Sequence, residues 1–323
     1  RCAIAWSSWP SFAYATPSTV EEAVALLSEK WGESEVMAGG TDLVTCLKQD
    51  LTKPGRVVSL KGIAGLSGIL KEGDSITIGA TTKLRELIAS ADVQKNFPAL
   101  VTAAKNIASP QMINMGTVGG DLLQRPRCWY YRMGFGLFGT QDGKPLIPTG
   151  ENRYHAIFGN SGPAYFVNAS SLAPALIALD ATFHLVGAQA RMVKAADFFA
   201  TPKAETDREY VLKPNEILTR IEIPVKGLKN GVFEIRQRTG LDWPMVAAAV
   251  AFDGSGGKVV LGHVAPTPWV AQKASGMLKG APSEADAAGI GAAAADGATP
   301  MSKNSYKIQQ VKVAVKRAIV AAA

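Results

Sequence analysis

A pair of glycines, Gly39-Gly40, lies between a short apolar run and a segment with helical spacing, within Val36-Met37-Ala38-Gly39-Gly40-Thr41-Asp42-Leu43. Glycines between a strand and a helix let the backbone approach a ligand closely, because a Cβ atom there would obstruct it. The first amides of the following helix lack partners and carry the positive end of its dipole. Such a turn can hold a pyrophosphate without a lysine. A tight turn with only a structural role is the alternative.

A second segment, Asn114-Met115-Gly116-Thr117-Val118-Gly119-Gly120-Asp121, also combines small residues, a hydroxyl and exposed amides. One such glycine pair is a weak indication of a ligand. Two of them, in separate parts of the chain, favour a long diphosphate cofactor clamped between two subdomains.

Other motifs in the sequence are weaker indications of a functional site. A GxGxxG pattern runs from Gly134 to Gly139, but its flanks do not predict the strand and helix of a dinucleotide-binding unit. The three histidines, His155, His184 and His263, show no metal-ligand spacing. No Walker lysine, GxSxG or HExxH motif is present. The sequence therefore predicts no catalytic set of side chains on this chain.

Length and composition bound the class of protein. A chain of 323 residues predicts two or three domains, and 47 % hydrophobic with 19 % charged residues is a normal globular balance. The net charge is +7, but the Lys and Arg residues are scattered, which argues against nucleic-acid binding. The basic residues predict a solvated surface or one that faces an acidic partner. No run of about 18 apolar residues occurs, so no membrane span is expected.

The three cysteines, Cys2, Cys46 and Cys128, share no metal-ligand spacing, so neither a zinc site nor a self-contained iron–sulfur cluster is expected. So few cysteines fit a reducing compartment. We therefore expect a cytoplasmic protein, with the periplasm, reached together with a partner subunit, as the alternative. Residues 1–11 read as an N-terminal tail that lacks the features of a secretory signal.

The elements that must position the first glycine turn form a unit at 12–65. Thr19 and Glu22 have the spacing of a capping box, and Thr41 is the expected cap of the helix after the turn. The expected elements are a helix at 19–31, a strand at 35–38, a helix from 41 to about 51 and a strand at 57–60. Strands that alternate with helices in this way predict a small parallel sheet.

The second glycine turn falls in a unit at 66–225. The expected elements are strands at 66–70, 75–79 and 182–186, helices at 82–89, 98–108 and 172–179, a glycine-bearing loop at 109–120 and a long inserted loop at 122–166. A third unit, 226–323, is expected to hold antiparallel strands at 231–236, 246–252 and 258–264, followed by Ala-rich helices. The fold class is therefore α+β.

Taken together, these segments resemble the FAD-binding medium subunit of the xanthine dehydrogenase and carbon monoxide dehydrogenase family, the molybdenum hydroxylases. The marks are the turn Ala38-Gly39-Gly40-Thr41-Asp42-Leu43, the turn Thr117-Val118-Gly119-Gly120, and the segment Ser171-Leu172-Ala173-Pro174-Ala175-Leu176. The resemblance runs from about Phe12 to the C-terminal helices. It implies a two-subdomain PCMH-type FAD-binding fold followed by a three-stranded antiparallel sheet with helices.

The resemblance also implies roles for residues. The first turn is expected to wrap the FAD pyrophosphate and ribityl chain, the second to contact the diphosphate and ribose, and the segment near Ser171 to lie by the adenosine. Relatives commonly have Arg at the position of Ile113 and Asn at that of Asp121, and some have Asp at that of Ser171. The expected cofactor-binding residues are Met37, Ala38, Gly39, Gly40, Thr41, Asp42, Leu43, Asn114, Thr117, Gly119, Gly120, Asp121, Ser171 and Leu172.

The inserted loop begins with Gln124-Arg125-Pro126-Arg127-Cys128-Trp129-Tyr130-Tyr131-Arg132, which is similar to the aldehyde oxidoreductase-like branch of the family. Some relatives there hold a [4Fe–4S] cluster on four cysteines. This loop contains only Cys128, so we expect no cluster and a packed thiol. We expect the loop from Gln124 to Phe166 to shield the flavin and to contact a partner subunit, because ordering so long a loop must be offset. That its aromatics merely cover the second unit's core is the alternative.

The resemblance implies an electron-transfer role. An iron–sulfur small subunit would deliver electrons through [2Fe–2S] clusters, a large molybdopterin subunit would oxidise an aldehyde or heterocycle, and FAD on this chain would pass the electrons to an external acceptor. A stand-alone FAD-dependent oxidase or reductase is the alternative. It should carry base candidates over the flavin, whereas the C-terminal unit is Ala-rich and poor in His and Tyr. A flavin-free scaffold is a third possibility.

Overall fold

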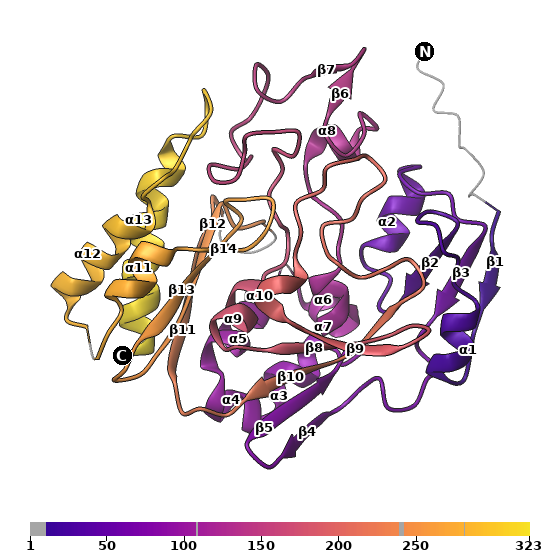
Figure 1. The fold of residues 1–323 in the computed structure, drawn as a ribbon, viewed down its shortest axis with the longest axis horizontal. Coiled ribbons are helices and arrows are strands. Elements are labelled where there is room, and N and C mark those ends of the chain that lie inside the picture. Colours follow the sequence, from indigo (N-terminus) through magenta and orange to yellow (C-terminus); the bar gives the residue numbers. More distant parts are fainter. Residues whose placement is uncertain (1–10, 108, 239–241, 281) are drawn as a thin grey trace.

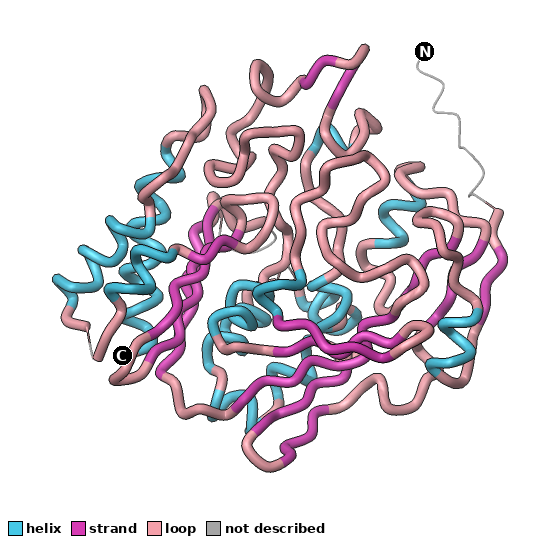
Figure 2. Tube along the Cα trace, viewed as in Figure 1, coloured by secondary structure: helices cyan, strands magenta, loops and turns pink. Residues whose placement is uncertain are grey.

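The computed structural model describes residues 11–107, 109–238, 242–280 and 282–323. An N-terminal, a central and a C-terminal sheet lie side by side, and the long insertion lies above them in the view of Figure 1. Figure 2 shows that most of this upper region is loop rather than helix or strand. The architecture is the α+β class predicted from the sequence.

The N-terminal unit contains a three-stranded parallel sheet in the order β1-β3-β2, which confirms the predicted small parallel sheet. Both predicted strands lie within one residue of β2 and β3. The elements are β1 (Ala13–Ala15), α1 (Val20–Ala25), β2 (Ser34–Met37), α2 (Leu43–Lys48) and β3 (Arg56–Ser59).

Helix α1 begins with the predicted capping box, in which Thr19 accepts from the Glu22 amide. It ends at Ala25 rather than near Trp31, whose ring instead packs on Tyr210 with centroids 6.1 Å apart. The expected cap of the second helix was also wrong. Asp42, not Thr41, is the N-cap residue of α2, and it makes no side-chain capping bond.

The central unit has a five-stranded sheet in the order β4-β5-β10-β8-β9, with antiparallel neighbours. Its strands are β4 (Ile69–Glu72), β5 (Ser75–Gly79), β8 (Thr182–Val186), β9 (Ala190–Lys194) and β10 (Ile217–Pro224). Its helices are α3 (Leu84–Ala89), α4 (Ala91–Asn96), α5 (Pro98–Lys105), α6 (Pro110–Met115), α7 (Val118–Leu122), α9 (Ala173–Ala178) and α10 (Ala195–Phe198). The segment 109–120, expected as a loop, thus forms two short helices, because Ser109 and Thr117 each accept a capping bond from a backbone amide.

The C-terminal sheet has the order β11-β12-β13-β14, so it has four strands in the described residues where three were predicted. The fourth strand was missed because it is only two residues long. The elements are β11 (Lys229–Ile235), β12 (Val246–Phe252), β13 (Gly257–Gly262), β14 (Trp269–Val270), α11 (Gln272–Met277), α12 (Glu284–Ala294) and α13 (Tyr306–Ala322). Every residue of β12 is buried, because α5 and α9 cover one face of the sheet and α13 the other.

The inserted loop has little regular structure of its own: α8 (Trp129–Arg132) and a hairpin of β6 (Thr140–Gln141) and β7 (Lys144–Pro145). Polar side chains fasten it to the C-terminal unit. The buried amide of Asn304 donates to the carbonyls of His155 and Ala156. The ammonium of Lys307 donates to three carbonyls, those of Tyr154, His155 and His263. The loop is therefore held in a defined position.

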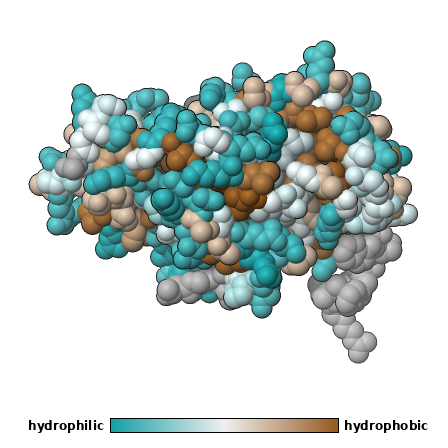
Figure 3. Space-filling model, turned by 90° about the horizontal axis from the view of Figure 1, so that it is seen from below, coloured by the Kyte–Doolittle hydropathy of each residue, from teal (hydrophilic) through white to brown (hydrophobic). Residues whose placement is uncertain are grey.

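The surface seen from below is mostly hydrophilic, with separate hydrophobic areas between polar ones (Figure 3). None of the helices in the described ranges combines the length and the apolar character required to cross a bilayer.

Candidate functional site

The two glycine turns touch each other where the N-terminal and central units meet. A Cβ atom at Gly39 would lie 2.1 Å from the carbonyl oxygen of Met115 and 3.3 Å from Cα of Gly116. Backbone atoms cannot yield to that extent without moving a whole unit. Gly39 is therefore required for the close packing of one turn on the other, a reason that the sequence did not reveal.

A cleft of about 530 Å³ runs along this junction. Every residue from Met37 to Leu43 lines it, and Thr117, Gly119 and Gly120 line the same cleft. Arg125, with Tyr131 and Leu137 further along the inserted loop, also forms part of its wall. The structure thus brings ten of the fourteen predicted cofactor-binding residues together on one cavity, within the size range of small-molecule and cofactor sites.

The first turn offers unpaired backbone donors to this cleft. Within the described residues, the amides of Gly39, Gly40 and Thr41 donate to no protein acceptor. Gly40 has φ of +78°, a conformation that L-residues with a side chain rarely adopt. Consecutive free amides in such a turn form an anion-binding concavity. The observed geometry therefore suits a phosphate group.

The second turn differs, and the expectation of exposed amides was wrong there. The amides of Val118 and Gly119 donate to the carbonyls of Thr82 (3.0 Å) and Ala80 (2.8 Å). The amide of Gly120 donates to the Thr117 hydroxyl, 3.1 Å away, which caps α7. The second turn therefore presents a close-packed wall to the cleft rather than a set of donors.

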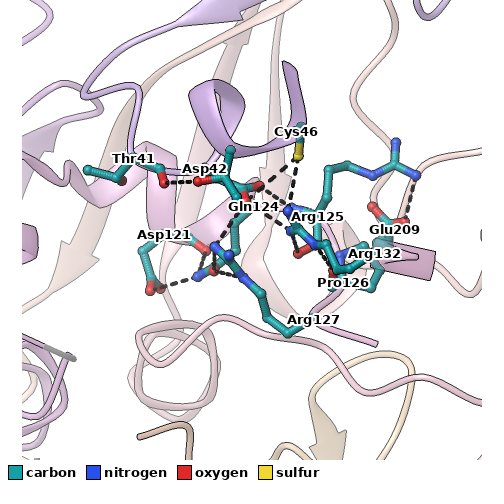
Figure 4. A network of polar contacts seen from close by, with 11 residues as sticks. Thr41, Asp42, Cys46, Asp121, Gln124, Arg125, Pro126, Arg127, Arg132 and Glu209 are labelled. Carbon is teal, nitrogen blue, oxygen red and sulfur yellow. Dashed lines mark hydrogen bonds and ion pairs between the residues drawn. The ribbon is translucent and has the colours of Figure 1, made fainter. Parts of the chain in front are cut away.

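The carboxylate of Asp42 holds the inserted loop against the first turn (Figure 4). Its Oδ2 accepts from the Arg125 amide at 2.8 Å, and its Oδ1 lies 3.0 Å from Arg127 and 2.9 Å from Arg132. Arg132 also donates to the Cys46 sulfur at 3.2 Å. The loop is expected to contact a partner subunit, but the side chains of Arg127 and Arg132 are largely buried and face this chain's own Asp42.

A second ion pair anchors the loop deeper in the molecule. The Arg125 guanidinium lies 3.3 Å from the buried carboxylate of Glu209. Burial raises the pKa of Glu209, and the neighbouring Arg125 opposes that shift. Nearby, the guanidinium of Arg208 stacks on the Trp31 ring, 4.6 Å from its centroid, at one end of the cleft.

Asp121 is directed at its own chain. Its carboxylate accepts from the Ser170 hydroxyl at 2.5 Å, the Leu172 amide at 3.0 Å and the Ser171 amide at 3.4 Å. Burial raises its pKa. Asp121 therefore fixes the segment before α9 to the second turn. Leu172 itself is fully buried in the core, and only its backbone takes part.

A smaller cavity continues from the cleft, since Thr41, Asp42, Thr117, Gly120 and Gln124 line both. Asp121 and Ser171, which were predicted to contact the cofactor, reach this smaller cavity. Its remaining walls include residues that sequence reasoning missed, namely Asn106, Ile107, Arg236 and Trp243. Arg236 and Trp243 lie far from both turns in sequence, and no local pattern marks any of the four.

Asn114, the last of the predicted residues, is exposed on α6 and lines neither cavity. The structure gives it no contact with the site.

The GxGxxG pattern at Gly134 to Gly139 has a different role from dinucleotide binding. The amides of Leu137 and Phe138 donate to the carboxylate of Glu205, at 2.6 Å and 3.2 Å. The pattern thus binds an anion that belongs to the chain itself.

Cys128 is a half-buried thiol whose sulfur lies 3.2 Å from Nε2 of His155. Burial raises the pKa of this thiol to about 11 and lowers that of His155 to about 4, so both are uncharged at neutral pH. Among the described residues, no three His, Cys, Asp or Glu side chains are grouped so that they could hold a metal ion.

Comparison with known proteins decides the family. Residues 10–226 match the model of the FAD binding domain in molybdopterin dehydrogenase. The chain belongs to this family. It is therefore the FAD subunit of a molybdenum-containing dehydrogenase, as the motifs had predicted.

Individual relatives agree over nearly the whole chain. The carbon monoxide dehydrogenase medium chain of Afipia carboxidovorans is 30 % identical over 324 residues, covering 96 % of both chains. The aldehyde oxidoreductase FAD-binding subunit PaoB of Escherichia coli is 30 % identical over 281 residues, 83 % of this chain and 86 % of that protein. A solved structure of carbon monoxide dehydrogenase from Hydrogenophaga pseudoflava superposes with a TM-score of 0.75 at 29 % identity, covering 98 % of both chains. The predicted family and fold class are thus confirmed.

Proposed function

We propose that the cleft between the two glycine turns holds FAD with its pyrophosphate on the first turn. The observation that carries this proposal is the row of unpaired amides from Gly39 to Thr41, in a cavity of about 530 Å³. A diphosphate needs donors, and backbone amides supply them without a counter-charge from lysine. FAD bound there supplies two-electron redox chemistry.

The remaining residues divide into contacts and supports. Thr117, Gly119 and Gly120 form the opposite wall, where the glycines allow the turn to pack closely on Ala80 and on the Thr117 hydroxyl. Ser171 reaches the smaller cavity and is proposed to lie by the adenosine. Asp42 and Asp121 act by holding the inserted loop and the segment before α9, so we propose that they position the site rather than bind the cofactor directly.

Two results would test the cofactor. Acid extraction of the full chain followed by chromatography should release FAD in equimolar amount to the protein. Recovery of FMN, or of no flavin, would contradict the proposal and favour a scaffold that has kept the fold without the cofactor.

For the complex, we propose electron transfer from [2Fe–2S] clusters on a small subunit, fed by a molybdenum cofactor on a large subunit, to an external acceptor. Two relatives support this proposal by their names, as a medium chain and as an FAD-binding subunit. The organic substrate, an aldehyde or a heterocycle, would bind on the large subunit. We place the complex in the cytoplasm, with the periplasm as the alternative.

The inserted loop is proposed to have both of its expected roles. Arg125, Tyr131 and Leu137 support the shielding role, because they wall the cleft. The hairpin of β6 and β7 supports the contact with a partner, because it projects from the molecule and most of it is exposed (Figure 1). Met133, at the end of α8, is a further exposed apolar side chain of the inserted loop, with 72 % of its surface accessible.

Purification with native partners would test this organisation. The chain should co-purify with iron and molybdenum in the complex, and the separated chain should not oxidise aldehydes or heterocycles. Rapid substrate turnover by the separated, FAD-loaded chain would favour the stand-alone oxidase instead. Iron and EPR analysis of the separated chain checks the inserted loop, where a stoichiometric [4Fe–4S] signal would overturn the expectation of no cluster.

A further inference from the structure

One segment of the central unit, residues 203–208, joins two walls of the large cleft that belong to other parts of the chain. We call it the strap, and it lies in the connection between α10 and β10. The residues that line the cleft here are Glu205 and Arg208 of the strap, Trp31 and Glu35 of the N-terminal unit, and Gly136 and Leu137 of the inserted loop. The strap therefore lies where three parts of the molecule meet around one cavity.

The chain on either side of the strap is firmly fixed. The amide of Ala200 donates to the carbonyl of Glu209 at 3.0 Å, and the amide of Val211 donates to that of Phe198 at 2.8 Å. The carboxylate of Glu209 is buried and lies 3.3 Å from the Arg125 guanidinium. The strap thus projects from a base that has its own hydrogen bonds and ion pair.

The strap also has a shape of its own. The carboxylate of Asp207 accepts from the amides of Lys203 and Ala204, both at 2.9 Å. The amide of Asp207 donates to the Ala204 carbonyl at 3.0 Å. A turn closed by internal hydrogen bonds keeps its form when its outer contacts break. The strap can therefore move as one piece about its base, as loops that close over ligands do.

Two contacts hold the strap across the cleft. On the side of the N-terminal unit, the Arg208 guanidinium stacks on Trp31, 4.6 Å from the ring centroid. On the side of the inserted loop, the carboxylate of Glu205 accepts from the amides of Leu137 and Phe138, at 2.6 Å and 3.2 Å. Both of these amides belong to the GxGxxG segment, for which the proposed function has no use.

The contact of Glu205 is built to form and to break. Gly136 has φ of +75°, and a Cβ atom there would lie 3.0 Å from both carboxylate oxygens of Glu205. Consecutive amides in such a turn form an anion-binding concavity. Glu205 is exposed, so water can replace the two amides around its carboxylate. The buried Glu209 differs, because separating it from Arg125 would leave an uncompensated charge.

We propose that the strap closes the cleft and that Glu205 is the residue that releases it, so that Glu205 controls how fast FAD enters and leaves. The inference rests on the proposed function, in which FAD lies between the walls that the strap joins. Both hydrogen-bond donors to Glu205 belong to the chain, so the contact is the same with and without FAD. Its loss should therefore speed entry and exit by the same factor and leave the affinity unchanged.

The test measures both rate constants on the full chain. Stopped-flow flavin fluorescence after mixing FAD-free chain with FAD gives association. Exchange of bound, isotopically labelled FAD against excess unlabelled FAD gives dissociation. In Glu205→Ala both rate constants should rise about tenfold or more, because the lost hydrogen bonds involve a charged acceptor. The dissociation constant should equal that of the wild type.

A second variant removes the same contact from the other side. Gly136→Ala adds a Cβ atom 3.0 Å from the Glu205 carboxylate, which must swing away. The variant should show the same rise in both rate constants, and combining it with Glu205→Ala should add nothing further.

Two controls match these changes. Gly143→Ala lies in the same inserted loop at nearly the same φ, +73°, where no atom of the described residues is within 4 Å of the added Cβ. Glu72→Ala removes an exposed carboxylate of the central unit that does not line the cleft. Both should show the rate constants of the wild type.

Hydrogen exchange provides a readout that needs no cofactor. The amides of Leu137 and Phe138 should exchange slowly in FAD-free wild type and faster in Glu205→Ala, because their acceptor is lost. Equally fast exchange in both proteins would show that the contact does not form, and the inference would be overturned.

The kinetic outcomes separate this inference from the proposed function. Unchanged rate constants in Glu205→Ala would overturn the inference. Faster dissociation with unchanged association would also overturn it, because Glu205 would then stabilise the bound state alone. In both cases FAD still binds and the proposed function stands. A wild-type chain that takes up no FAD would contradict the proposed function and this inference with it.

Discussion

The two glycine turns look alike in sequence but differ in what their backbones do. In the first, Gly40 has a left-handed conformation and the amides from Gly39 to Thr41 are free to bind a ligand. In the second, the amides of Val118, Gly119 and Gly120 are all paired within the central unit. A glycine pair after an apolar run is therefore compatible with an anion-binding turn or with a close-packed wall, and only the hydrogen-bond partners distinguish the two.

A substitution at the junction between the two turns should cause the largest loss of bound FAD. In a Gly39→Ala variant, the new Cβ would lie 2.1 Å from the Met115 carbonyl oxygen, so the two units must separate. We expect most of the bound FAD to be lost, because the overpacking costs ~1–3 kcal/mol and displaces the wall of the cleft itself. Flavin absorbance per chain after gel filtration measures this.

Gly55→Ala is the matched control for that change. It adds the same methyl group in the same unit, where the nearest atom, the Glu33 carbonyl oxygen, is 3.6 Å away, an ordinary contact. Full flavin content is expected for this control. Full flavin content in Gly39→Ala as well would show that the two turns do not need to touch for FAD to bind.

A pair of single-methyl changes would separate the roles of the two turns. Gly40→Ala places a side chain on a residue with φ of +78°, a strain of ~1–2 kcal/mol. The strained backbone is the one whose amides face the ligand. Gly119→Ala places a Cβ 2.9 Å from the Ala80 carbonyl oxygen, inside the packed central unit. We expect the FAD-free protein to relieve this strain by leaving the left-handed conformation at position 40, so that the cost is met on binding: Gly40→Ala should weaken FAD binding about tenfold with little loss of stability in the FAD-free protein.

The second member of the pair should behave in the opposite way. Gly119→Ala should lower the free energy of unfolding of FAD-free protein by ~1–3 kcal/mol, with a smaller effect on FAD affinity. Urea unfolding without FAD and a flavin titration give the two quantities. If both variants changed affinity and stability in the same ratio, the distinction between a binding turn and a structural wall would not hold.

Much of this architecture could be predicted because it follows from local patterns. Strands such as β2, β3, β8 and β12 are short apolar runs bounded by turn residues, and they lie within a residue of their expected positions. The family-defining turns were recognisable for the same reason. The family match then confirmed the fold class that these patterns implied.

The parts that could not be predicted depend on contacts between distant residues. The pairing of Asp42 with Arg127 and Arg132 joins positions more than eighty residues apart, and no local pattern in the sequence indicates it. Trp243 and Arg236 reach the site from a third unit without a local motif. Residues 109–120 form two short helices instead of the expected glycine-bearing loop because Ser109 and Thr117 cap them.

The smallest expected effect is on the pH dependence of the free energy of unfolding. It concerns Asp121, the residue that ties the second turn to the segment before α9. Burial raises its pKa above the ordinary value of 3.8. The unfolded chain therefore releases this proton at a lower pH than the folded chain does. Between the two pKa values the folded state binds more protons, so this group's contribution to stability is present below pH 3.8 and is lost as pH rises through the folded pKa.

Asp121→Asn removes this dependence while it retains an oxygen that can accept from the Leu172 amide. We expect the variant to be no less stable than the wild type at neutral pH, and its advantage to disappear as the pH falls toward 3.8. Urea unfolding of both proteins across this range gives the difference directly, because all other titrating groups are common to the two. A variant that became less stable relative to the wild type as the pH rose would mean that the ionised carboxylate is favoured by its bonds to Ser170 and Leu172. The fold would then stabilise a buried negative charge at the second turn. In that respect the second turn would resemble the first, which offers free amides to an anion, even though its own amides are paired.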